Sequence, residues 1–328
     1  MASVTTSSND WPCAALPEAE LAARTTMHVG GRAQWLLEPA TPAELEDAWT
    51  AAHGRGLPVR ILGGGANVVI DDGVLPGVVI TTARMRRVFR PMPGGEGGLE
   101  EEFSRGEMAL PHPSEDPRLV AWAGCTLPAL LRAARDLGYS GLEGIVGVPG
   151  HVGGGVAMNA GGRWGDMWDV IEHVRVIDPD GTARGLDRAE CSPRYRNGGL
   201  GDSLVVGAVL RFDPQPKPLV KERMREYLVA KNSVQPVTDW SAGCIYKNPD
   251  PDQSEGRSAG KLVDDVGGKE LSRGDAIVSP LHGNFIVNRG KATATDVFTL
   301  MEDLQDLVAQ KTGIRLEFEV KRWRAQGD

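Results

Sequence analysis

Long apolar runs and paired cysteines are both missing from this sequence. Its 328 residues contain no uninterrupted run of about 20 apolar residues, so we expect no membrane insertion. Residues 1–21 also lack the basic and apolar regions of a signal peptide. The four cysteines, Cys13, Cys125, Cys191 and Cys244, form no CxxC pair, so neither a zinc site nor a redox dithiol is indicated. We expect a cytoplasmic protein with reduced thiols and no metal.

Lysine is missing from the first 213 residues, and all nine lysines lie between residues 214 and 328. The formal net charge of −8 therefore rests on the first part of the chain, whereas the last part is neutral. An acidic protein is a poor general binder of nucleic acid, so we expect no nucleic-acid partner. The change in composition, together with Pro214, Pro216 and Pro218, favours a domain boundary near residue 214.

Strand and helix patterns alternate along the chain. Thr41 is a predicted N-cap, with Pro42 at the first helical position and Glu44 three residues after the cap, so a helix should run to about His53. The other predicted helices cover 127–137, 220–232 and 295–312, and the predicted strands cover 57–62, 78–81, 120–123, 174–177, 204–212 and 314–320. This order favours an α/β or α+β protein. Residues 91–118, rich in Pro, Gly and Glu, are predicted to form a surface insertion.

Glycine is concentrated in two segments. Gly63–Gly65 follows a predicted strand, where free N–H groups can form an anion-binding nest, although a tight structural turn is the alternative. It fits neither a Walker loop nor the Rossmann pattern, because a strand-like run follows it. Residues 144–162 contain eight glycines, which predict backbone lying flat against a ligand rather than a conventional packed element. The two segments together indicate one large ligand that contains a diphosphate.

The sequence offers three further candidate residues, Arg196, Cys244 and Glu319, and the ordinary alternative for each is structural. A lone cysteine is usually a small buried side chain, and single charges usually lie at the surface.

Several motifs occur in order along the chain. They are Thr25–Gly31, the first glycine segment with Ala66 and Asn67, Pro149–Gly161, Tyr195–Arg196, Ser241–Pro249, Ala259–Val263, His282–Asn288 and Glu317–Val320. Together they resemble the UDP-N-acetylenolpyruvoylglucosamine reductase (MurB) family, over roughly residues 22–90 and 119–323.

The resemblance implies an α+β fold of the vanillyl-alcohol-oxidase (PCMH) type that binds FAD. It divides the chain into a flexible arm at 1–18, FAD-binding subdomains at 19–85 and 86–213, and a third, substrate-binding α+β domain at 214–328. The short distance between Arg196 and Ser241 resembles the second type of the family, which lacks an inserted tyrosine-bearing loop. We expect a monomer.

The implied activity is reduction of UDP-N-acetylglucosamine enolpyruvate to UDP-N-acetylmuramate in peptidoglycan synthesis, with non-covalent FAD and with NADPH as co-substrate. Arg196 and Glu319 would polarise the substrate carboxylate, and Cys244 would donate the final proton. A thiol has a pKa of roughly 8.5 and keeps its proton at neutral pH. The resemblance implies cofactor-binding roles for Gly63, Gly64, Gly65, Ala66, Asn67, Gly124, Pro149, Gly150, Val152, Gly153, Gly154, Asn159 and Ala160, and substrate-binding roles for Tyr195, Lys247, Asn248, Lys261, His282 and Asn284.

The sequence departs from the family pattern at three of these sites. Cys244 occupies the position of the proton-donating serine, Ala66 replaces a serine of the flavin loop, and His151 stands where a small hydroxyl residue is usual. The main alternative is a flavin oxidase of the same fold acting on a sugar or alcohol. Such oxidases often tether FAD through a histidine near the first glycine segment, and residues 58–72 contain none. A catalytically silent nucleotide-binding protein is the alternative from another class.

Overall fold

A computed structural model describes residues 10–91, 106–108 and 116–325. By its internal contacts the chain divides into two units, each assembled from separate segments. Unit 1 contains Leu36–Gly64 and Val78–Ala230 together with the described part of residues 1–17, and unit 2 contains Glu18–Trp35, Gly65–Gly77 and the chain from Lys231 on. The mixture of helices and strands in both confirms the predicted α+β class.

A four-stranded sheet near the start of the chain has the order β1-β2-β5-β3, with β3 parallel to β5. Its strands are β1 (Ala14–Glu20), β2 (Arg32–Glu38), β3 (Val59–Leu62) and β5 (Val74–Thr81). Residues 14–18, predicted as part of a flexible arm, thus belong to a strand, and Trp11 before them is buried beneath the guanidinium of Arg55. Residues 1–9 of that arm lie outside the described residues.

The predicted first helix is confirmed as α1 (Pro42–Gly54), which packs on β3. Thr41 Oγ1 accepts a hydrogen bond from Glu44 N at 3.2 Å, and Glu44 Oε2 accepts one from Ala40 N at 2.9 Å. The first bond satisfies one of the N–H groups that a helix start leaves without partners, and the second fixes the residue before the cap to the first turn.

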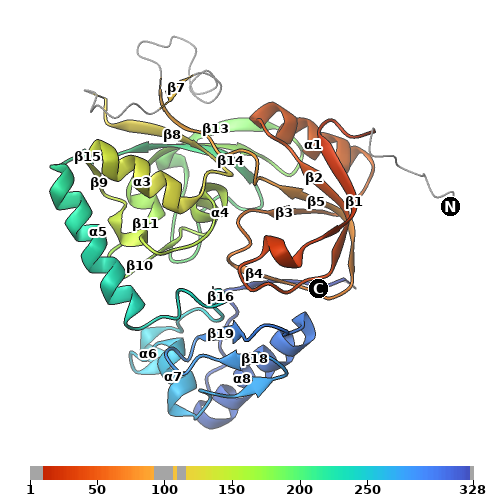
Figure 1. The fold of residues 1–328 in the computed structure, drawn as a ribbon, viewed down its shortest axis with the longest axis vertical. Helices are drawn as coiled ribbons and strands as arrows, with labels where there is room; N and C mark the ends of the chain where they lie inside the picture. Colours follow the sequence, from red (N-terminus) through yellow and green to blue (C-terminus); the bar gives the residue numbers. More distant parts are fainter. Residues whose placement is uncertain (1–9, 92–105, 109–115, 326–328) are drawn as a thin grey trace. The chain divides into compact units, whose positions relative to one another are not determined.

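Unit 1 is built on a six-stranded sheet of order β13-β12-β14-β8-β6-β7, in which every neighbouring pair is antiparallel. Helix α4 packs on β8 and β14, and α3 lies beside it (Figure 1). The bounds are β6 (Val88–Pro91), β7 (Gly106–Met108), β8 (Arg118–Trp122), β12 (Ile171–Ile177), β13 (Ala183–Asp187), β14 (Leu204–Arg211), α3 (Leu127–Leu137) and α4 (Val152–Ala157). Within the predicted insertion 91–118, β7 pairs with β6, and residues 92–105 and 109–115 lie outside the described residues.

The glycine-rich residues 152–157 form helix α4, whereas no conventional packed element was predicted there. Gly153 and Gly155 allow the helix to approach its neighbours closely. A Cβ on Gly153 would lie 2.9 Å from Ala123 Cβ, and one on Gly155 would lie 3.1 Å from Leu127 Cδ2. Glycine costs about 1 kcal/mol in a helix relative to alanine, and this close packing offsets that cost.

By its internal contacts, unit 1 extends to Ala230, past the proline-rich stretch at 214–218. The helix α5 (Lys217–Asn232) follows the proline-rich stretch, and its Tyr227 stacks on Trp164 with ring centroids 4.8 Å apart. Strand β15 (Asp213–Pro214) likewise pairs with β9 (Tyr139–Ser140). Because both contacts are made to unit 1, most of α5 belongs there.

Unit 2 contains a four-stranded sheet of order β16-β19-β18-β17. Helix α8 packs against β17, β18 and α7 (Figure 1). A separate parallel pair joins β4 and β20. The bounds are β4 (Val68–Ile70), β16 (Ser241–Cys244), β17 (Ser272–Arg273), β18 (Ala276–Val278), β19 (Phe285–Asn288), β20 (Lys321–Trp323), α6 (Pro251–Ser254), α7 (Ala259–Asp265) and α8 (Ala294–Thr312).

The predicted strand 314–320 is wrong. Regular pairing begins only at Lys321, and within 314–320 the one recorded bridge joins Phe318 to Tyr246. The apolar residues of this segment face the unit 2 core without a continuous ladder, and the carbonyl of Leu316 accepts from Gln305 Nε2 at 2.6 Å.

The remaining short elements complete the chain. They are β10 (Gly161–Gly162), β11 (Gly165–Asp166), η2 (Ala22–Arg24), η3 (Glu143–Ile145), η4 (Met167–Asp169) and η5 (Arg188–Glu190). No helix in the described part of the chain is long and apolar enough to cross a membrane.

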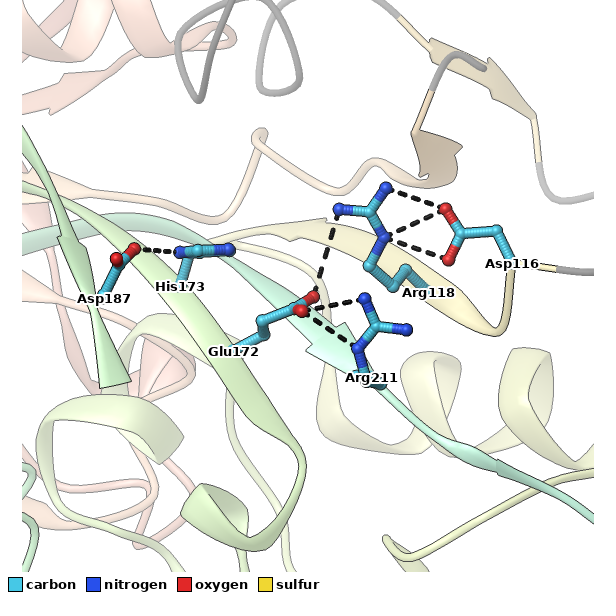
Figure 2. Close-up of polar contacts among 6 residues, drawn as sticks. All are labelled: Asp116, Arg118, Glu172, His173, Asp187 and Arg211. Atoms are coloured by element: carbon cyan, nitrogen blue, oxygen red, sulfur yellow. Dashed lines mark hydrogen bonds and ion pairs between the residues drawn. The ribbon is translucent and has the colours of Figure 1, made fainter. Parts of the chain in front are cut away.

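A charged cluster lies on one face of the six-stranded sheet. Arg118 on β8 and Arg211 on β14 are directly paired across the strands, which places like charges opposite each other. Figure 2 shows the Glu172 carboxylate between the two guanidinium groups. It accepts a hydrogen bond from Arg211 Nε at 2.9 Å and forms a longer ion pair with Arg118 Nη1 at 3.9 Å. Asp116 contacts Arg118 at 2.7 Å, and this hydrogen bond lowers the pKa of the Asp116 carboxyl. The carboxylates thus compensate the opposed arginines.

Candidate functional site

The first glycine segment has the free N–H groups that an anion-binding loop requires. Among the described residues, none accepts a hydrogen bond from the main-chain N–H groups of residues 63–67. The glycines are also needed for space. A Cβ on Gly64 would lie 2.7 Å from Gly150 Cα, and Gly65 has a φ of +63° with Arg24 O only 2.2 Å from the Cβ position. Such a loop, whose N–H groups have no recorded acceptor in the described protein, fits a phosphate.

His151 lies against this loop. Its Cδ2 is 3.1 Å from the Cβ position of Gly64, and its Nδ1 is 3.5 Å from Thr82 Oγ1. Burial, with a smaller effect from Arg86, lowers the pKa of His151 to about 4. The ring is therefore neutral at physiological pH.

The second glycine segment offers less free backbone than the sequence indicates. Val152 N donates to Cys125 O at 2.8 Å, and Gly153 N donates to Ala123 O at 2.9 Å. Gly154 is different, because a Cβ there would meet no atom within 4 Å. Within α4, Gly154 therefore has the most room for a ligand.

Several other predicted cofactor-binding residues also have structural roles. A Cβ on Gly124 would lie 1.7 Å from Thr82 O, so glycine is required there by packing alone. Ala160 N donates to Gly155 O at 2.8 Å. Pro149 is exposed beside Gly150. The buried side chain of Asn159 is hydrogen-bonded within the protein at both ends, so contact with a cofactor would have to use its backbone.

Cys244 and Glu319 lie on adjoining segments of unit 2. Glu319 N donates to the carbonyl of Ile245, the residue after Cys244, at 2.8 Å, and Lys247 N donates to Glu317 O at 2.8 Å. Both Cys244 and Glu319 are partly exposed. The structure thus brings together two of the three predicted catalytic residues.

Ala66 and Asn67, which follow the first glycine segment, lie at the same place. Asn67 Nδ2 donates to Glu319 O at 3.2 Å, and the Cβ position of Gly243 lies 3.8 Å from Ala66 O. Unit 2 therefore combines Ala66, Asn67, Cys244 and Glu319 in one neighbourhood.

Sequence patterns missed two residues that hold this neighbourhood together. Thr26 Oγ1 donates to Ser241 O at 2.7 Å, and its main-chain N donates to Gly65 O at 3.1 Å. Asn288, buried on β19, donates to Met27 O at 3.0 Å. Both residues lie in motifs of the resemblance, Thr25–Gly31 and His282–Asn288, but those motifs did not identify the partners.

Lys247 and Asn248 line a pocket of about 540 Å³ in unit 2, opposite residues 312–317. Lys247 Nζ lies 3.0 Å from Glu317 Oε2, and Asn248 Oδ1 accepts from Ala259 N at 3.0 Å. Both predicted substrate-binding residues thus face a cavity and have protein partners.

Asn284, predicted to bind substrate, is 3% exposed, and its side-chain amide is hydrogen-bonded to the backbone of Tyr246. Its Oδ1 accepts from Tyr246 N at 2.9 Å, and its Nδ2 donates to Tyr246 O at 2.7 Å. Asn284 therefore fixes the chain two residues after Cys244. His282, whose pKa is lowered by burial, accepts from Asn284 N at 3.1 Å. Lys261 is exposed and pairs with Asp265 at 2.6 Å, which raises the pKa of Lys261.

Arg196 belongs to unit 1, on a tight turn with Tyr195. Its φ is +56°, and its guanidinium lies 4.9 Å from the ring centre of the exposed Tyr195. Burial raises the pKa of Asp166, Asp169 raises it further, and the charge of Arg196 opposes the shift. Cys244 and Glu319 belong to unit 2, so the predicted catalytic residues are divided between the units. Within the described ranges, no group of three or more His, Cys, Asp or Glu side chains is arranged to hold a metal ion.

Two family models match this chain. Residues 33–187 match an FAD-binding domain, and residues 235–323 match the UDP-N-acetylenolpyruvoylglucosamine reductase, C-terminal domain. The first model ends within unit 1 and the second lies entirely in unit 2.

Relatives match over almost the whole chain. The UDP-N-acetylenolpyruvoylglucosamine reductase of Moorella thermoacetica is 36% identical over 92% of this chain and 91% of the relative. That of Deinococcus radiodurans is 37% identical over 93% and 95%. The crystal structure of the reductase from Thermus caldophilus has 34% sequence identity, covers 94% of this chain and 98% of its own, and superposes with a TM-score of 0.72.

Proposed function

Because this chain belongs to the UDP-N-acetylenolpyruvoylglucosamine reductase family, we propose that it reduces UDP-N-acetylglucosamine enolpyruvate to UDP-N-acetylmuramate, using NADPH and FAD, in peptidoglycan synthesis. The observation that carries this proposal is the joint match of an FAD-binding domain and the reductase's own C-terminal domain within one chain. Relatives of that name align along more than 90% of the chain, so both parts are accounted for.

The residues of the first glycine segment fit FAD. Bound FAD supplies the relay that carries a hydride from NADPH to the terminal vinyl carbon of the substrate. Residues 63–67 would hold its diphosphate through their unpartnered N–H groups. Gly154, which faces open space, would allow a second close approach.

Arg196 and Glu319 would act on the substrate carboxylate. When hydride reaches the vinyl carbon, negative charge develops on the carbon bearing the carboxylate and spreads into that group. A guanidinium stabilises this charge directly, and such preorganised electrostatic stabilisation is usually a large catalytic term. A protonated Glu319 would add a hydrogen bond to the same group.

Cys244 would complete the reaction as general acid. Its S–H bond breaks, a C–H bond forms at the carbon bearing the carboxylate, and the thiolate regains a proton from solvent. A positioned general acid typically contributes about 10²–10⁴-fold in rate. The partial exposure of Cys244 beside Glu319 and Ala66 agrees with this role.

The oxidase alternative is weaker. The match of residues 235–323 is specific to the reductase, and residues 58–72 contain no histidine for a covalent flavin link. Acid precipitation of the protein checks this point, since a non-covalent flavin should stay in the supernatant.

The experiment that tests the proposed function is a two-step anaerobic titration. Purified protein should show the yellow flavin spectrum, lose it with NADPH, and regain it when UDP-N-acetylglucosamine enolpyruvate is added. Failure of the sugar nucleotide to restore the colour would contradict the proposal, and a colourless protein that does not take up FAD would favour a silent binding protein.

We also propose that the enzyme works as a monomer in the cytoplasm, where NADPH and nucleotide sugars are supplied. Sedimentation equilibrium and cell fractionation test these two points.

A further inference from the structure

Asn159 is a buried residue with an unusual backbone conformation and a side chain bonded at both ends. It is 6% exposed and has a φ of +43°, which asparagine tolerates better than most residues. Its Nδ2 donates to Arg194 O at 3.2 Å, and its Oδ1 accepts from Trp168 N at 3.2 Å. Asn159 follows α4, so it links the glycine-rich helix to a distant loop.

That loop is the turn that carries Arg196. Arg194 N donates to Asn197 O at 2.7 Å and Asn197 N donates to Arg194 O at 3.0 Å, so Tyr195 and Arg196 form the corner of a two-residue turn. The carbonyl that Asn159 holds therefore also closes the turn.

A second contact fixes the turn to the same helix. Gly198 N donates to Ala157 O at 2.8 Å, and a Cβ on Gly198 would lie 2.3 Å from Val156 O. Trp168, whose main-chain N donates to Asn159 Oδ1, also contacts this helix, since its Nε1 donates to Val156 O at 2.9 Å. The turn is thus attached to the end of α4 both before and after Arg196.

We propose that Asn159 is a positioning residue for Arg196, acting through the carbonyl of Arg194. This inference rests on the proposed function, in which Arg196 binds the substrate carboxylate. A bond from a buried amide to the first residue of the turn restricts where the guanidinium can lie. Misplacement of a catalytic group by about 1 Å can cost on the order of 10²-fold in rate.

The test separates the donor from the acceptor of Asn159. Asn159→Asp has almost the same shape, tolerates the same φ and still accepts from Trp168 N, but an ionised carboxylate cannot donate to Arg194 O. In stopped flow with the FAD-loaded enzyme, reduction by NADPH should stay within twofold of wild type. Reoxidation by the enolpyruvyl substrate should slow at least tenfold.

Asn197→Asp is the matched control, since it makes the same chemical change within the same turn. Asn197 is exposed, and its Oδ1 already accepts from Gly199 N at 2.7 Å, a bond that a carboxylate preserves. It adds a negative charge next to Arg196 without removing a donor to the turn. Reoxidation within threefold of wild type is expected, and a loss as large as that of Asn159→Asp would assign the effect to charge and overturn the inference.

Two further variants separate this inference from the proposed function. In an Arg196→Ala background, Asn159→Asp should cause no additional slowing, because residues that act as a unit are not additive. Additive losses, loss of FAD, or equal damage to both half-reactions would overturn the positioning role. If Arg196→Ala alone reoxidises at the wild-type rate, the proposed role of Arg196 fails and the positioning role fails with it. Amide exchange at Asn197 then reports whether Asn159 still holds the turn, with faster exchange expected in Asn159→Asp.

Discussion

Gly64 lies so close to Gly150 that a Cβ on Gly64 would come within 2.7 Å of the Gly150 Cα. Gly64→Val, a natural probe of phosphate binding, should therefore destabilise the fold as well as the flavin site. Gly63→Ala is the cleaner probe, because its nearest neighbour, His151 Cβ, would lie at an ordinary 3.8 Å. We expect Gly63→Ala to keep its melting temperature as apoprotein and to bind FAD at least tenfold more weakly. FAD titration by fluorescence measures this, and unchanged affinity would move the diphosphate elsewhere.

Replacing Cys244 should affect only the step that uses the substrate. Cys244→Ala should be reduced by NADPH at the wild-type rate but be reoxidised by substrate about 10²-fold more slowly or worse, because the proton donor is gone. Cys244→Ser should retain activity, and an alkaline fall in reoxidation caused by thiol ionisation should disappear. Stopped-flow reoxidation between pH 6 and 10 measures both. Wild-type reoxidation in the alanine variant would leave Cys244 as a packed side chain.

Glu319→Gln tests the carboxyl group with little change in shape. Its main-chain bond to Ile245 O is retained, so the segment should keep its place. We expect normal reduction by NADPH and reoxidation slowed at least tenfold. Glu317→Gln, which removes the exposed partner of Lys247, is the control and should have a smaller effect. Equal damage to both half-reactions in Glu319→Gln would indicate a structural role instead.

His151 should make the apoprotein less stable in mild acid. Its folded pKa of about 4 lies below the unfolded value of roughly 6.5, so between these values the unfolded chain binds the extra proton. The stability contributed by neutral His151 is therefore complete above pH 6.5 and is lost as the pH falls towards 4, by roughly 3 kcal/mol at most. Urea unfolding at pH 7 and 4.5 should show a smaller decrease for His151→Gln than for wild type. His53→Gln, at an exposed site on α1, should behave like wild type.

The charged cluster of Figure 2 predicts a salt-dependent effect on stability. Glu172→Gln leaves Arg118 and Arg211 opposed across the strands with only Asp116 to compensate. We expect a loss of about 1 kcal/mol at low salt that shrinks at high salt, since these groups are partly exposed and screened. Glu222→Gln, in an exposed pair with Arg225 on α5, should leave the melting temperature unchanged. If both substitutions lower the stability equally, the charged cluster has no specific role in stability.

The elements with local signals were predictable from the sequence. The helix at 127–137 was expected with its observed bounds, because Thr126 caps its start and Gly138, at φ +78°, ends it. The long helix predicted from 295 begins at Ala294, after the capping box of Thr293 and Asp296. In both cases the residues that decide the boundary are close in sequence to the helix.

Contacts between segments that are distant in sequence explain the two errors in the predicted secondary structure. Residues 314–320 are apolar enough to predict a strand, but their backbone groups form hydrogen bonds with Ile245, Lys247 and Gln305 instead of a regular ladder. The glycines of α4 did not predict a packed helix, because the residues that they pack against lie elsewhere in the sequence.

The motifs were enough to propose the candidate site, but they gave no sign of its internal hydrogen bonds. Cys244 and Glu319 were identified through the family resemblance, and the structure brings their segments together. The side-chain bonds of Asn159 and Asn284 had no such signal, because an amide can bond backbone at any sequence distance and leaves no periodic pattern.

Strand β4 finds its only parallel partner among the described strands in β20, which joins Val68–Ile70 to Lys321–Trp323. During synthesis on the ribosome, residues 68–70 must therefore wait until about 250 further residues have been made, at roughly 5–20 residues per second, before this pair can form. For more than ten seconds a strongly apolar strand directly after the first glycine segment lacks this partner, and it becomes a natural target for chaperones. Completion of the surroundings of the first glycine segment thus depends on residues 321–323, which are made much later.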